Sequence, residues 1–74
     1  MRRSRNAGIR LSERDAAIVK GMLARGDRQS DIAAFFKVNG GRISEVNTGH
    51  RFAGVRPALP DQLPPPGPYE PQTT

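Results

Sequence analysis

The sequence contains no cysteine and no tryptophan, and its only aromatic residues are three phenylalanines and one tyrosine among 74 residues. Without cysteine, neither a disulfide framework nor a thiolate zinc site can brace the fold. The apolar runs are only a few residues long, which excludes a membrane-spanning helix, and the basic N-terminus lacks the apolar stretch of a signal peptide. We therefore expect one small domain with a modest core, located in the cytoplasm.

The residue patterns of common catalytic sites are also missing. The sequence has no P-loop, no GxSxG motif, no cluster with metal-ligand spacing, and a single histidine, His50. The acidic pairs Glu13/Asp15 and Asp27/Asp31 stand near expected helix starts, where the helix dipole favours them. We expect no catalytic residue, no metal and no cofactor, so the sequence does not indicate an enzyme.

Positive charge is concentrated at the N-terminus. Residues 1–11 contain four arginines and no acid, and so supply +4 of the net charge of +5. A basic arm of this kind suits a polyanionic partner, although it also serves as a solvated, solubilising terminus. The chain has ten arginines and two lysines. This ratio favours nucleic acid, because the planar guanidinium matches phosphates and bases, but a G+C-rich genome produces the same ratio.

Apolar periodicity is confined to residues 12–53 and predicts three helices with no strand. Ser12 followed by Asp15 is a shortened capping box at the start of the first helix, and Gly26 is placed to end it. The apolar stripe of this helix consists of Ile18, Val19, Met22 and Leu23. Gly21, inside the helix, costs about 1 kcal/mol relative to alanine unless close packing explains it.

The second and third predicted helices are short. The second begins near Arg28 or Gln29 and runs through Phe36, burying Ile32, Ala33 and Phe36. The third begins after Asn39, a favourable N-cap, and ends at Thr48-Gly49, burying Ile43 and Val46. Isolated helices of fewer than ~12 residues are marginal in water, so both must bury their apolar faces against the first helix.

All seven prolines lie in residues 57–74. This composition predicts a disordered or polyproline II-like tail rather than a helix or a central strand. The sequence thus divides into a basic arm (1–11), an all-α three-helix domain (12–56) and a Pro-rich tail (57–74).

The stretch GDRQSDIAAFFKVNGGRISEVNTG (26–49) resembles the helix-turn-helix family of DNA-binding proteins over about 24 of the 74 residues. Gln29 stands where phage-repressor-type members often place glutamine, and Ala33 at the position where the two helices cross. Val38 matches the apolar turn position, and Thr48-Gly49 resembles the Asn-Gly that closes the recognition helix. The resemblance implies that the third helix enters the DNA major groove.

Two narrower likenesses extend this one. The basic arm RRSRNAGIRLSERD followed by the helical pair is similar to the DNA-binding domain of invertase and resolvase recombinases, in which such an arm enters the minor groove. The recombinase catalytic domain has no counterpart here. The stretch GRISEVNTGHRF also looks like the small helix-turn-helix modules of phage homing endonucleases, in which an aromatic residue follows the last basic pair; here it would be Phe52.

Two positions depart from the family pattern. Lys37 stands where the turn usually has glycine, so either the turn differs or it carries strain. Gly40-Gly41 occupy positions that supply base-reading side chains in related proteins. The glycines are consistent with a helix start that lies close to the DNA backbone, with low sequence specificity, or with a frayed first turn.

The resemblance assigns candidate roles to individual residues. Base readout falls to four polar residues of the third helix: Arg42, Ser44, Glu45 and Asn47. Contacts with the DNA backbone fall to Arg28, Gln29, Lys37, Gly40, Gly41, Thr48, His50 and Arg51. The arm contributes Arg2, Arg3, Arg5 and Arg10. A solvated helix surface explains Arg42 and Glu45 as well.

The expected partner is therefore double-stranded DNA, bound by a prokaryotic or phage-like transcription regulator or a protein associated with the nucleoid. The alternative is a protein-interaction adaptor that uses the Pro-rich tail and an exposed Phe35; that tail also suits an inert spacer, and Phe35 also suits packing on the first helix or the arm. A homodimer is a hypothesis that rests on small size alone, and no membrane partner is expected.

Overall fold

The computed structural model describes residues 10–68 and contains three α-helices, with no strand among those residues. The helices are α1 (Glu13–Arg25), α2 (Gln29–Phe36) and α3 (Gly40–Thr48), and a short 3-10 helix, η2 (Pro60–Gln62), follows. The all-α architecture and the three expected helices are confirmed. Residues 1–9 and 69–74 lie outside the described part, and with them lie Arg2, Arg3 and Arg5 of the expected arm.

Local hydrogen bonds set the ends of α1. The Ser12 hydroxyl accepts from the Asp15 backbone N–H at 3.1 Å, and the Asp15 carboxylate accepts from the Ser12 N–H at 3.0 Å. Gly26 ends the helix in the left-handed region, with φ 102°. The predicted capping box and C-terminal glycine of α1 are both confirmed.

The core lies where the three helices meet, and each helix contacts the other two. Its buried side chains are Ala16, Val19, Met22, Ile32, Ala33, Ile43 and Val46. Of the residues expected inside, Ile18, Leu23 and Phe36 are only partly buried and pack against the edge of this cluster. Phe35 and Phe36 lie about 100° apart on α2; their rings make an edge-to-face contact at 5.0 Å, and Phe35 stays 38% exposed.

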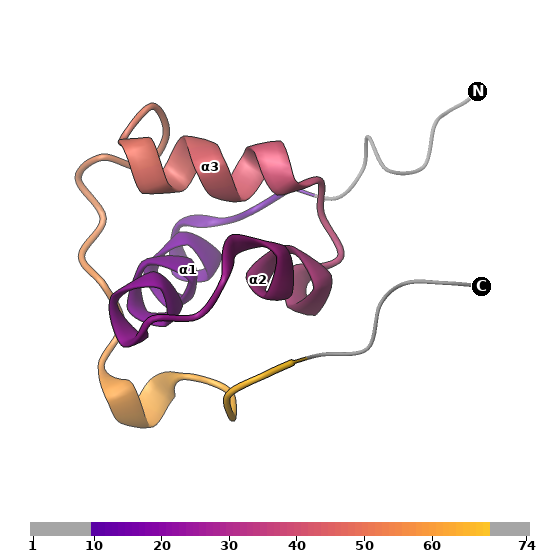
Figure 1. The fold of residues 1–74 in the computed structure, drawn as a ribbon. Coiled ribbons are helices and arrows are strands. Elements are labelled where there is room, and N and C mark those ends of the chain that lie inside the picture. Colours follow the sequence, from indigo (N-terminus) through magenta and orange to yellow (C-terminus); the bar gives the residue numbers. More distant parts are fainter. Residues whose placement is uncertain (1–9, 69–74) are drawn as a thin grey trace.

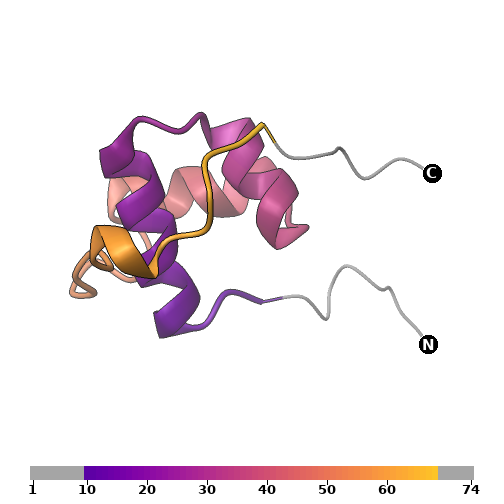
Figure 2. The same cartoon turned by 90° about the horizontal axis from the view of Figure 1, so that it is seen from below.

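Residues 57–68, which the sequence predicts to be disordered or polyproline II-like, are packed against α1. They cross α1 on the side opposite α3, as the two views show (Figures 1 and 2). The Ala58 N–H donates to the Ala17 carbonyl at 2.8 Å, Leu63 packs against the core, and Arg25 donates to the Pro64 carbonyl at 2.8 Å. Prolines prevent a regular helix or ladder here, but a segment held by hydrogen bonds to the backbone and side chains of a neighbouring helix needs neither.

Gly21 allows this segment to approach α1. A Cβ at position 21 would lie 2.7 Å from Leu63 Cδ2 and 3.0 Å from the Ala58 carbonyl oxygen. The close packing that would justify a glycine inside a helix is therefore present.

We predict that Gly21→Ala destabilises the protein by about 1 kcal/mol, although alanine is the better helix former by about that amount. The reason is that overpacking typically costs about 1–3 kcal/mol. Urea denaturation followed by circular dichroism measures the change. Gly40→Ala is the matched control, because a Cβ there meets nothing within 4 Å. Gly21→Ala should cost less in a Leu63→Ala background, and an equal cost in both backgrounds would contradict the packing account.

Candidate nucleic-acid interface

The outer surface of α3 is open to solvent along its whole length. Ile43 and Val46 point into the core, while Gly40, Gly41, Ser44 and Thr48 are exposed. Residues 57–68 lie on the far side of α1 and leave this surface uncovered (Figure 1). α1 and α2 thus hold α3 in place through its buried face and leave its other face exposed.

The first turn of α3 is well formed. The Asn39 side chain accepts from the Gly41 N–H at 2.7 Å, which confirms the predicted N-cap. Gly40 is not required by the fold: its φ is not in the left-handed region, and a Cβ would meet open space. A Cβ at Gly41 would meet only the Asn39 side-chain oxygen, at 3.2 Å.

The turn between α2 and α3 is strained at Lys37. This residue has φ 61° and ψ 42°, in the left-handed region where a side chain costs about 1–2 kcal/mol. Its position is fixed by the next residue, because the Val38 N–H donates to the Ala33 carbonyl at 3.1 Å and Val38 packs against the core. The turn therefore keeps the backbone geometry that glycine would favour, but it carries an exposed cation.

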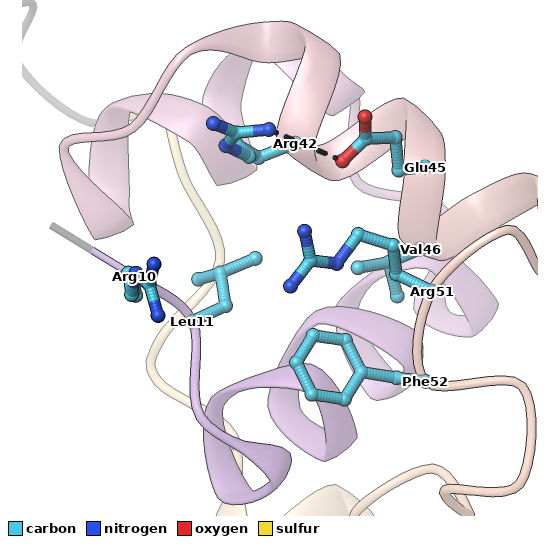
Figure 3. A pocket seen from close by; sticks show the side chains of 7 residues that line it. All are labelled: Arg10, Leu11, Arg42, Glu45, Val46, Arg51 and Phe52. Carbon is cyan, nitrogen blue, oxygen red and sulfur yellow. Dashed lines mark hydrogen bonds and ion pairs between the residues drawn. The ribbon is translucent and has the colours of Figure 1, made fainter. Parts of the chain in front are cut away.

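Three arginines from separate segments surround a hollow beside α3 (Figure 3). Arg10 precedes α1, Arg42 lies in α3, and Arg51 follows α3; the hollow has a volume of about 220 Å³. Arg42 pairs with Glu45 at 3.4 Å. The remaining lining residues are apolar: Leu11, Val46 and Phe52. Arg42 and Glu45 thus lie close to Arg10 of the arm. Asn47, in contrast, is rotated by roughly 140° from Arg42 around the axis of α3.

The other candidate residues occupy the ends of the two motif helices. Arg28 is exposed at the N-cap of α2, 4.0 Å from Asp31, and Gln29 is half-buried beside it. Thr48 and His50 share a hydrogen bond of 2.7 Å between Oγ1 and Nδ1 just beyond α3. Asn47 and Thr48 line a second, shallower hollow with Lys20 and Leu23.

Lys20 was not among the residues that the sequence singled out. Its ammonium group reaches from α1 to the loop after α3 and donates to the carbonyls of Phe52 at 2.5 Å and Val55 at 2.7 Å. The same loop holds Phe52 at φ 58°, a backbone conformation that is rare for an aromatic residue. Lys20 therefore positions the ring that forms one wall of the arginine hollow. No local pattern predicts a contact between residues 32 positions apart.

Comparison of the chain with protein-family models, curated proteins and solved structures finds no match in any of the three. Within residues 10–68, no three His, Asp or Glu side chains are grouped to hold a metal ion. No helix in the described part of the chain combines the length and apolar composition needed to cross a bilayer. A function is therefore inferred from the residues and their geometry.

We predict that Lys20→Met lowers the free energy of unfolding by about 1–3 kcal/mol, because the loop carbonyls lose a charged donor. Lys37→Met makes the same chemical change at an exposed position, and its free energy of unfolding should stay within about 0.5 kcal/mol of that of the parent protein. Thermal or urea unfolding measures both. Equal effects at the two positions would remove the positioning role of Lys20.

Proposed function

We propose that this protein binds double-stranded DNA through the exposed face of α3. The third helix would lie in the major groove, the residues that flank the motif would contact phosphates, and the basic arm would reach the minor groove or the backbone. Such a protein acts as a small transcription regulator or as an architectural protein of the nucleoid.

The observation that carries the proposal is the glycine pair at the start of α3. The first turn is capped and intact, yet nothing inside the fold requires glycine at position 40. Glycine in a helix costs up to about 1 kcal/mol relative to alanine. The Gly41 and Arg42 N–H groups are already bonded to Asn39. A phosphate backbone that passes close to Gly40 explains the residue, because phosphate is attracted to helix N-termini and a side chain at this position would stand in its way.

The charges around α3 support the same partner. Among residues 10–68, no carboxylate lies within ion-pair distance of Arg10, Lys37 or Arg51. Lys37 is the C-cap of α2, three positions before α3 begins at Gly40, and Arg10 and Arg51 line the hollow beside α3. Cations without acidic partners are available to neutralise phosphates and release their counterions.

Within this arrangement, specificity for sequence would be limited. Ser44 and Thr48 are the outward side chains of α3, and both are short. Arg42 and Asn47 lie on opposite flanks of the helix, and Glu45 is engaged with Arg42. Arg42 is the best-suited reader of guanine, while Gln29, Arg28 and His50 would contact the backbone.

The adaptor alternative rests on the exposure of Phe35 (38%) and Leu59 (63%). Both side chains are large enough to anchor a protein partner. Residues 57–68, however, pack on α1 rather than extend as a polyproline ligand. The proline content of the segment suggests a polyproline ligand, but its packing on α1 makes the adaptor alternative weaker.

We predict salt-sensitive binding of a random-sequence duplex, measured by fluorescence anisotropy at about 50 mM and about 200 mM salt. With roughly four phosphate contacts, affinity should fall by about 100-fold between the two conditions. Arg51→Gln should weaken binding. Arg56→Gln removes the same charge from an exposed site in a hollow that no α3 residue lines, and should have little effect. No binding at low salt would favour the adaptor.

We further predict that Arg42→Ala reduces the difference in affinity between a selected site and random duplex, by about 1–3 kcal/mol. Deletion of residues 2–6 should instead weaken all duplexes similarly, because arm contacts carry little sequence information. Competition titrations with both DNAs separate these effects. Equal losses on selected and random DNA for Arg42→Ala would remove its assigned role.

A further inference from the structure

The arginine hollow combines several positive charges with an apolar lining. Its guanidinium groups come from Arg10, Arg42 and Arg51, and its only carboxylate is Glu45, so its lining has a net charge of +2. The Arg42 and Glu45 side chains are 54% and 39% exposed, which makes their ion pair weak. An incoming anion can take the place of Glu45 beside Arg42.

The opposite wall of the hollow is apolar. Leu11, Val46 and Phe52 form it, and Val46 is only 2% exposed. Arg51 reaches over the Phe52 ring, with its guanidinium carbon 5.5 Å from the ring centroid (Figure 3). The Lys20 ammonium group donates a hydrogen bond to the Phe52 carbonyl and so fixes the backbone at this residue. Phe52 and Arg51 are therefore held in place by contacts that no ligand has to supply.

The size and charge of the hollow define the ligand class. Its volume of about 220 Å³ is below the ~300 Å³ at which pockets for drug-sized ligands begin. Arginine forks match the oxygens of phosphate, and a phosphomonoester carries a charge of about −1.5 to −2 at neutral pH. That charge complements the +2 lining, and a small flat group beside the phosphate would complement the apolar wall.

We propose that this hollow binds a small phosphomonoester, with the phosphate among the three arginines and a planar or apolar group against Phe52, Leu11 and Val46. Arg42 and Arg51 also belong to the proposed DNA face. If the chain binds DNA as proposed above, the ligand competes with the duplex for these cations and acts as a negative effector.

Phenyl phosphate is the probe, because it combines one phosphate with one flat ring. Titration into the full chain is followed by ¹⁵N heteronuclear NMR, including the arginine Nε–H signals. We expect saturable shifts at residues lining the hollow, with a Kd of about 1 mM or tighter. Inorganic phosphate, which lacks the ring, and phenol, which lacks the charge, should both bind more weakly.

Arg51→Gln should weaken phenyl phosphate binding by about 10-fold or more, since a hydrogen bond to a charged group contributes about 1.5–3 kcal/mol. Arg42→Gln provides a second test at a different segment. Arg56→Gln is the charge-matched control and should leave the Kd unchanged. Signal dispersion checks that each variant is folded. Shifts that remain linear to about ten times the expected Kd, or equal losses for Arg51→Gln and Arg56→Gln, would overturn the proposal.

A displacement experiment separates this site from DNA binding. Phenyl phosphate should release a labelled duplex more effectively than sodium chloride at equal ionic strength. Phenyl phosphate binding without any duplex binding would leave the hollow as a ligand site and remove the proposed DNA function. Duplex binding that Arg51→Gln weakens, with no saturable phenyl phosphate binding, would assign the hollow to the DNA backbone and overturn the ligand proposal.

Discussion

The burial of Ile32 and Ile43 against Val19 and Met22 is the interaction on which the rest of the molecule depends. All four side chains are fully buried. The helices that carry the two isoleucines are eight and nine residues long, shorter than the ~12–15 residues at which an isolated helix becomes marginally stable. A helix cap contributes only about 1 kcal/mol, so neither helix would persist without the core. The exposed face of α3 exists because its other face is held.

The chain stabilises this small core from the side away from α3. Ala17 and Gly21 offer a surface on α1 without bulky side chains, and the segment containing Ala58 and Leu63 packs against it. Arg25 then holds the Pro64 carbonyl. The contacts of residues 57–68 thereby lie on one side of α1, which leaves the outer face of α3 uncovered (Figure 1).

Two residues between the end of α2 and the start of α3 are unfavourable for the fold, and they lie three positions apart in the sequence. Lys37 adopts a left-handed conformation that glycine would adopt without strain, whereas Gly40 occupies a helical position with room for a side chain. A sequence selected for stability alone would have the opposite preference at both positions. Local departures of this kind concentrate at functional sites. A cation in the turn before α3 and a first turn without a side chain at position 40 both suit the DNA backbone contact that we propose.

The sequence by itself determined the three helices, because their ends depend on neighbours within a few residues. Ser12 with Asp15, and Asn39 with Gly41, form hydrogen bonds across two or three positions, so their patterns can be recognised without the fold. The same is true of the buried pairs on α2 and α3. Gly21 was the only local sign that another segment approaches α1 closely.

Only the tertiary structure decided which distant residues meet. Lys20 bonds to Phe52 across 32 positions and Arg25 to Pro64 across 39, and the three arginines of the hollow come from three segments. Such contacts depend on how the helices cross and on where the segments after α3 pack. Neither can be read from the amino-acid composition. The prolines of residues 57–68 therefore predicted a disordered or polyproline II-like segment, because they exclude regular hydrogen bonding within it. They do not exclude hydrogen bonds to a neighbouring helix, and these hold the segment on α1.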